Sequence, residues 1–133
     1  MTVLTGFLGA GKTTLLRAFL AEPEAQGALV IVNELGAVGI DAELLADRAR
    51  ALTEISGGCI CCTSYAELVR ALGDLASREP PRIFVETSGA ASPAGVLRAM
   101  TRSEGLALDG VICVVPALRL AALASINLAR EQI

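Results

Sequence analysis

Histidine is absent from the 133 residues. This excludes a Ser-His-Asp triad and a Cys-His catalytic pair, because both use histidine as the base, and it excludes imidazole ligands to a metal. Aromatic residues make up only 3% of the chain and tryptophan is absent, so there is little material on which nucleic-acid bases could stack. With 11 basic and 14 acidic residues, the formal net charge is −3, which also argues against a nucleic-acid partner.

Long uninterrupted apolar runs are missing as well. The most apolar stretch, residues 106–124, is broken by Asp109, Pro116 and Arg119, so we expect no membrane span. The first residues lack the basic and long apolar segments of a secretory signal. Three of the four cysteines stand within four residues, unlike the disulfide framework of a secreted domain. We therefore expect a cytoplasmic protein.

Hydrophobic residues make up 53% of the chain, which is enough to bury a core. Short apolar runs alternate along the chain with segments of helical periodicity. The predicted strands are residues 2–5, 28–32, 52–55, 82–85 and 110–115, and the predicted helices are 13–22, 42–50, 65–78, 93–103 and 116–124. The run at 110–115 is apolar throughout, which predicts a buried strand with Cys113 as a core residue. The alternation predicts an α/β fold, a mainly parallel sheet flanked by helices, whose ligands bind beyond the carboxyl ends of the strands.

A phosphate-binding motif stands at residues 6–13, where GFLGAGKT fits G-x-x-x-x-G-K-[ST] between a predicted strand and a predicted amphipathic helix. Glycines allow backbone amides to turn toward an anion, and the helix N-terminus adds further N–H donors. Lys12, the only lysine of the chain, can reach the β- and γ-phosphates, and the Thr13 hydroxyl can ligate Mg²⁺. The predicted nucleotide-binding residues are Gly6, Gly9, Ala10, Gly11, Lys12, Thr13 and Thr14.

An acidic residue ends a second apolar run. Glu86 follows Ile83–Val85 and precedes Thr-Ser-Gly. Phosphate-loop enzymes use an acid at a strand end to hold Mg²⁺ or its water shell, so we expect Glu86 to act with Lys12 in catalysis. The alternative is an ordinary polar residue at a strand end.

Three thiols form a cluster at Cys59, Cys61 and Cys62, between the predicted third strand and a long helix. Thiolates are soft ligands that suit Zn²⁺ and related ions, and three of them leave a fourth position open. Because this segment also follows a strand, we expect it at the same edge of the sheet as the phosphate loop. Small core cysteines or a redox pair are alternatives, and the adjacent Cys61 and Cys62 need not both reach one ion.

Four segments occur in an order that resembles the CobW-type phosphate-loop GTPases, the cobalamin-synthesis and zinc-metallochaperone group. They are GFLGAGKTT at 6–14, NELG at 33–36, GCICCT at 58–63 and ETSG at 86–89. The resemblance implies hydrolysis of GTP with Mg²⁺, and delivery of thiol-held Zn²⁺ or Co²⁺ to a metal-requiring client protein or to cobalamin synthesis. It also suggests Glu34 as a catalytic carboxylate near the nucleotide or the metal, the alternative being a solvated loop residue.

The sequence departs from the family pattern at several positions. Ala37, Ser92 and Pro116 stand where the family usually has an acid, and Tyr65 where an arginine is common. No guanine-reading Asn-Lys-x-Asp segment exists, because Lys12 is the only lysine. We therefore expect residues 1–133 to be a partial GTPase domain, truncated after about the fifth strand. The missing strands would leave apolar surface exposed, through which we expect self-association. The rival functions are another phosphate-loop kinase or ATPase, and a module that binds nucleotide and metal without hydrolysis.

Overall fold

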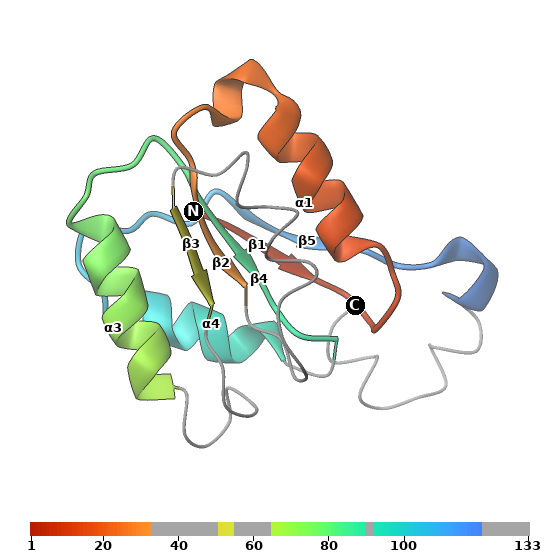
Figure 1. The fold of residues 1–133 in the computed structure, drawn as a ribbon. Coiled ribbons are helices and arrows are strands. Elements are labelled where there is room, and N and C mark those ends of the chain that lie inside the picture. Colours follow the sequence, from red (N-terminus) through yellow and green to blue (C-terminus); the bar gives the residue numbers. More distant parts are fainter. Residues whose placement is uncertain (33–50, 55–64, 90–91, 121–133) are drawn as a thin grey trace.

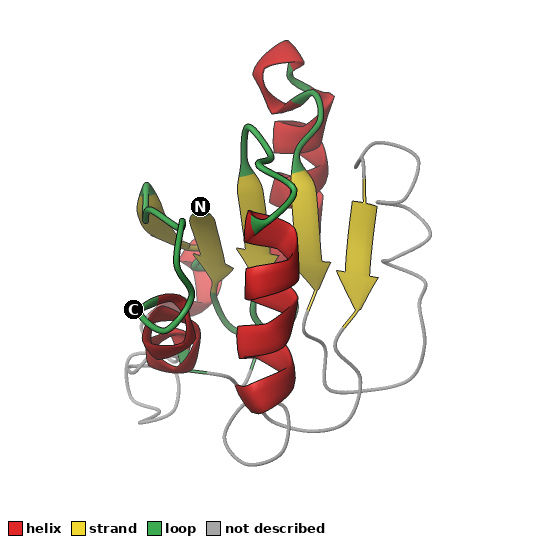
Figure 2. Ribbon diagram, turned by 90° about the vertical axis from the view of Figure 1, so that its left-hand side faces the viewer, coloured by secondary structure: helices red, strands yellow, loops and turns green. Residues whose placement is uncertain are grey.

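A five-stranded parallel sheet forms the centre of the protein. The computed structural model describes residues 1–32, 51–54, 65–89 and 92–120. The sheet has the order β3-β2-β4-β1-β5. Its strands are β1 (Thr2–Thr5), β2 (Leu29–Val32), β3 (Ala51–Glu54), β4 (Ile83–Glu86) and β5 (Gly110–Cys113). Each neighbouring pair is parallel, so the carboxyl ends of the strands share one edge, toward which the arrows in Figure 2 point.

Helices cover both faces of this sheet (Figure 1). One face carries α1 (Lys12–Ala21) and the short 3-10 helix η1 (Pro23–Ala25), and the other carries α3 (Tyr65–Ala76) and α4 (Pro93–Met100). A second 3-10 helix, η2 (Ala117–Arg119), follows β5. The predicted α/β architecture is therefore confirmed. Among the described residues, no helix is both long and apolar enough to cross a bilayer.

Successive side chains of a strand point to opposite faces of the sheet, and helices cover both faces, so the central strands are buried on both sides. On the α1 face, Leu4, Val30 and Phe84 pack against α1, and the rings of Phe19 and Phe84 stack with centroids 6.0 Å apart. On the α3 and α4 face, the buried cluster consists of Met1, Val3, Leu29, Ile31, Leu68, Leu72, Leu75, Ile83, Val85, Val96 and Ala99. Burying each of the larger side chains contributes about 1.5–3 kcal/mol, which explains why β2 and β4 carry apolar residues on both faces.

The prediction of a buried strand at residues 110–115 is wrong in part. The strand β5 ends at Cys113, and within the described sheet it lies at the edge with β1 as its neighbour. The side chain of Val111 is 42% exposed and Cys113 is only half-buried, so Cys113 is not a core residue. A short apolar run does not distinguish a central strand from an edge strand, because that difference depends on the neighbours that the sheet supplies.

The remaining elements differ from prediction mainly at their ends. The helix α4 begins as expected, with Pro93 at its first position and the Ser92 hydroxyl accepting a hydrogen bond from the Ala94 N–H at 3.3 Å. The helix α3 ends at Ala76. The predicted helix 42–50 lies outside the described residues, and so do residues 121–124 of the predicted helix 116–124, whose described part contains η2.

Candidate functional site

The loop between β1 and α1 curls back on itself through three glycines in left-handed backbone conformations. Gly6 has a φ of 138°, Gly9 of 73° and Gly11 of 95°. Residues that carry a side chain rarely adopt such φ angles, so these positions favour glycine. Gly11 caps α1 without a side-chain hydrogen bond, and the first turn of α1 contains no acidic residue. The helix therefore presents first-turn N–H groups and the positive end of its dipole without an acid of its own to neutralise them, as an anion site requires.

The ammonium group of Lys12 is folded into this loop. Its side chain is 7% exposed, and Nζ donates hydrogen bonds to the carbonyl oxygens of Gly6 at 2.9 Å and Phe7 at 3.3 Å. A buried cation needs such partners, because desolvation of an unpaired charge costs several kcal/mol. The lysine is thus held at the loop by bonds to neutral carbonyls, which phosphate oxygens can replace with stronger charge-assisted bonds.

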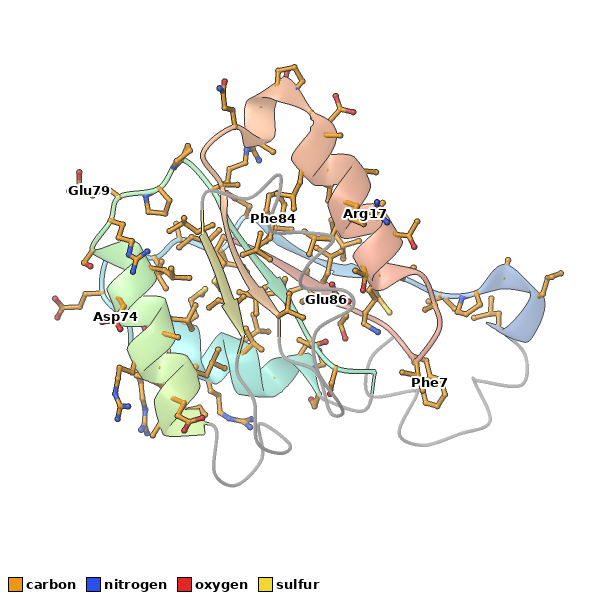
Figure 3. All side chains as sticks on the ribbon, viewed as in Figure 1. Phe7, Arg17, Asp74, Glu79, Phe84 and Glu86 are labelled. Atoms are coloured by element: carbon orange, nitrogen blue, oxygen red, sulfur yellow. The ribbon has the colours of Figure 1, made fainter. Side chains whose placement is uncertain are left out.

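A hydrogen bond joins the first turn of α1 to the acidic residue at the end of β4. The Thr13 hydroxyl donates to Oε1 of Glu86 at 2.7 Å, and the Glu86 side chain is 6% exposed. Figure 3 shows Glu86 at the carboxyl end of β4, next to the first turn of α1. The two residues are 73 positions apart in sequence, so the sheet register brings them together. A hydroxyl and a carboxylate are hard oxygen ligands, so this pair fits the coordination chemistry of Mg²⁺.

The loop is held between the two chain segments that follow β4 and β5. A Cβ added to Gly6 would lie 2.3 Å from the Val114 carbonyl oxygen, and one added to Gly89 would lie 2.5 Å from the Leu8 nitrogen. Both distances are too short for a real Cβ, and both neighbours are backbone atoms. The phosphate loop therefore has backbone directly against it on two sides.

Three buried hydroxyl groups lie near this edge. The Thr87 hydroxyl donates to the Leu4 carbonyl oxygen at 3.2 Å. Within the described residues, the hydroxyls of Thr5 and Ser88 have no hydrogen-bond partner, although the two side chains are only 0% and 5% exposed. Sequence reasoning gave these residues no role of their own, although Thr87 and Ser88 lie inside the quoted ETSG segment.

A thiol stands close enough to Lys12 to feel its charge. Partial burial raises the pKa of the Cys113 thiol above its ordinary value, and the positive charge of Lys12 opposes that rise. The thiol is therefore protonated at neutral pH and adds no negative charge to the phosphate loop.

The structure brings together most of the predicted nucleotide site and leaves the predicted metal site undescribed. The loop and the first turn of α1 contain the residues predicted to bind nucleotide, Gly6, Gly9, Ala10, Gly11, Lys12, Thr13 and Thr14, and the Thr13 hydroxyl is hydrogen-bonded to Glu86. Glu34, Cys59, Cys61 and Cys62 lie outside the described residues. In the part of the chain that is described, no group of three or more cysteine or acidic side chains could hold a metal.

The chain nevertheless leaves β3, the last described element before the thiols, at the same edge of the sheet. The strand β3 ends at Glu54, in register with Val32, which is itself in register with Glu86. Three strand spacings separate β3 from β1, a distance of about 14 Å.

Comparison with known proteins gives consistent results. A family model described as CobW/HypB/UreG, nucleotide-binding domain, matches residues 1–133. The chain is 42% identical over 127 residues to the zinc chaperone YjiA of Escherichia coli, a match that covers 88% of this chain and 40% of the relative. It is 40% identical over 133 residues to the zinc chaperone CobW of a Sinorhizobium species, covering 91% and 37%.

A eukaryotic relative is more distant. Identity is 34% over 127 residues to the zinc-regulated GTPase metalloprotein activator 1 of Schizosaccharomyces pombe, covering 86% of this chain and 31% of the relative. The chain thus spans less than half the length of each of these relatives. No solved structure matches it.

Proposed function

The chain belongs to the CobW/HypB/UreG nucleotide-binding family, and from this premise we propose that it binds and hydrolyses GTP with Mg²⁺ in the service of zinc delivery to a client protein. The observation that carries the nucleotide part is the 2.7 Å hydrogen bond between Thr13 and Glu86. It joins the hydroxyl at the end of the phosphate motif to a buried strand-end carboxylate, the pair of groups with which phosphate-loop enzymes hold Mg²⁺.

The residues of the loop account for triphosphate binding. Backbone N–H groups at the start of α1 bind phosphate oxygens, and the positive helix end favours their charge. The Lys12 ammonium exchanges the carbonyls of Gly6 and Phe7 for the β- and γ-phosphates. Thr13 and Glu86 would hold Mg²⁺, which when bound neutralises charge that develops on the phosphate oxygens.

For the metal cargo, we propose that Cys59, Cys61 and Cys62 bind Zn²⁺ or Co²⁺. Thiolate chemistry supports both ions, and the names of the relatives support zinc. Glu34 is the proposed carboxylate near the nucleotide or the metal. The end of β3 at the carboxyl edge supports a metal segment on the nucleotide side of the sheet. Delivery to a client protein or to cobalamin synthesis, action in the cytoplasm, and the role of residues 1–133 as the nucleotide-binding part of a longer GTPase belong to the same proposal.

Base preference is tested by displacing a fluorescent GTP analogue with GTP or with ATP in the presence of Mg²⁺. The proposal expects GTP to displace the analogue at much lower concentration than ATP. Equal displacement would favour the rival ATPase or kinase, and release of phosphate from bound GTP separates an enzyme from a module that only binds.

The metal ligands are tested by zinc titration of two matched variants. Replacing Cys59, Cys61 and Cys62 with serine should abolish tight binding of Zn²⁺. Cys113→Ser is the control, because Cys113 is the one cysteine outside the cluster, and this variant should bind zinc like the unmodified protein. Equal zinc binding by the triple variant and the control would overturn the assignment of the thiols.

A further inference from the structure

Ser88 has a buried hydroxyl for which the described structure provides no partner, and it lies between two residues that contact the phosphate loop. We propose that Ser88 is a positioning residue that hydrogen-bonds an oxygen arriving with the terminal phosphate of the nucleotide. That oxygen belongs either to the phosphoryl group or to a water in the Mg²⁺ shell. The inference rests on the proposed function, because it requires a triphosphate at the loop.

The position of Ser88 follows from its neighbours on both sides. Two residues before it, Glu86 accepts the hydrogen bond of Thr13 at the C-terminal end of the phosphate motif. One residue after it, Gly89 lies so close to the Leu8 nitrogen that a Cβ would approach to 2.5 Å. The segment 86–89 therefore runs along the loop from Thr13 to Leu8, and Ser88 belongs to the stretch between these two contacts.

The burial of the hydroxyl indicates that a partner arrives with a ligand. The Ser88 side chain is 5% exposed, and its oxygen is buried without a hydrogen bond to any residue that the structure describes. An unpaired buried hydroxyl is unfavourable, and in native proteins such a group calls for a specific explanation. A phosphoryl oxygen that enters with the nucleotide supplies the missing acceptor, or a water of the Mg²⁺ shell supplies a donor, and hydrogen bonds to charged groups are the stronger kind.

The two neighbouring hydroxyls do not offer the same possibility. The Thr87 hydroxyl is already bonded to the Leu4 carbonyl oxygen. The Thr5 hydroxyl also lacks a partner in the described part of the chain, but Thr5 follows Leu4 in β1 and so points to the opposite face, the face of α3 and α4. Glu86 and Thr13 meet on the α1 side. Thr5 therefore serves as a matched control, a buried unpaired hydroxyl at the same edge but on the other face.

The test compares Ser88→Ala, Ser88→Thr and Thr5→Val with the unmodified protein. Binding of GDP and of a non-hydrolysable GTP analogue is measured with Mg²⁺ and with EDTA, together with the melting temperature of the free protein. We expect Ser88→Ala to weaken binding of the GTP analogue about tenfold while GDP binding stays unchanged, and Ser88→Thr, which restores a hydroxyl, to recover most of the loss. Thr5→Val should leave both affinities unchanged.

The EDTA arm identifies the partner of Ser88. A tenfold loss that persists without Mg²⁺ assigns the partner to the phosphoryl group, whose oxygen accepts from the hydroxyl, and a loss confined to Mg²⁺ assigns it to the shell water, which donates to the Ser88 oxygen. The inference is overturned if Ser88→Ala binds both nucleotides normally, or if it weakens GDP and the GTP analogue equally, as general damage to the loop would. Failure of the unmodified protein to bind the GTP analogue would instead refute the proposed function, and this inference with it.

Discussion

Gly89→Ala tests whether backbone packing holds the phosphate loop in place. The added Cβ would lie 2.5 Å from the Leu8 nitrogen and 2.7 Å from the Leu8 Cα, whereas ordinary contact begins near 3.4 Å. The two segments must therefore separate by about 0.9 Å, and because the opposing atoms are backbone, no side chain can rotate away. Forcing an extra methyl group into packed structure typically costs about 1–3 kcal/mol. A loss at the low end of this range lowers the melting temperature of a domain of this size by about 4 °C.

A second glycine provides the control. Gly73 lies in the middle of α3, and a Cβ added there meets no atom within 4 Å. Gly73→Ala should stabilise the protein by about 0.5–1 kcal/mol, because alanine loses less backbone entropy than glycine in a helix. Thermal unfolding of the two variants should therefore shift in opposite directions. The packing argument is refuted if Gly89→Ala melts at or above the temperature of the unmodified protein.

Three further changes have defined outcomes. Glu86→Gln keeps an oxygen that can accept the hydrogen bond of Thr13 but removes the negative charge. The affinity for the GTP analogue should therefore fall at least tenfold with Mg²⁺ and change little in EDTA. Equal losses of affinity under the two conditions would contradict the Mg²⁺ role. Burial raises the pKa of the Cys113 thiol, so the stability that this thiol contributes is complete below the pKa of the unfolded thiol and is lost as the pH rises through the higher folded value. Cys113→Ser should therefore flatten the decline of the unfolding free energy above about pH 9. An unchanged slope would count against this reasoning. Ser92→Ala removes the cap of α4 and should cost about 1 kcal/mol in chemical denaturation, whereas Ser77→Ala, which removes an exposed hydroxyl bonded to the Asp74 carbonyl, should cost less.

Local sequence signals sufficed for the phosphate loop. The spacing of Gly6, Gly11, Lys12 and Thr13 dictates a turn with left-handed backbone angles that leads into a helix, and the structure has both. Such a motif determines its own conformation, because glycine geometry and the helix start act over a few residues. The contact of Glu86 with Thr13 was also predictable, because an acid at the end of a parallel strand lies at the edge where the loop begins.

Features that depend on distant neighbours were not predictable. The half-buried state of Cys113 follows from the edge position of β5, which no periodicity within residues 110–115 could reveal. The close approach of Gly89 to Leu8 arises where segments about 80 residues apart in sequence meet, and the Ser88 hydroxyl next to it is unpaired among the residues that the structure describes. A glycine or a serine after a strand gives no sign of which backbone will pack against it.

The central claim is that the triphosphate site and the thiol-held metal influence each other at one edge of the sheet. We propose that the metal is held while the triphosphate is bound and is released when the triphosphate is hydrolysed. The most direct measurement is the Zn²⁺ dissociation constant of the protein with a non-hydrolysable GTP analogue and with GDP, at equal Mg²⁺. The account predicts tighter zinc binding with the GTP analogue, by about fivefold or more, as in typical coupling between two sites. Equal zinc affinities in the two nucleotide states would contradict it.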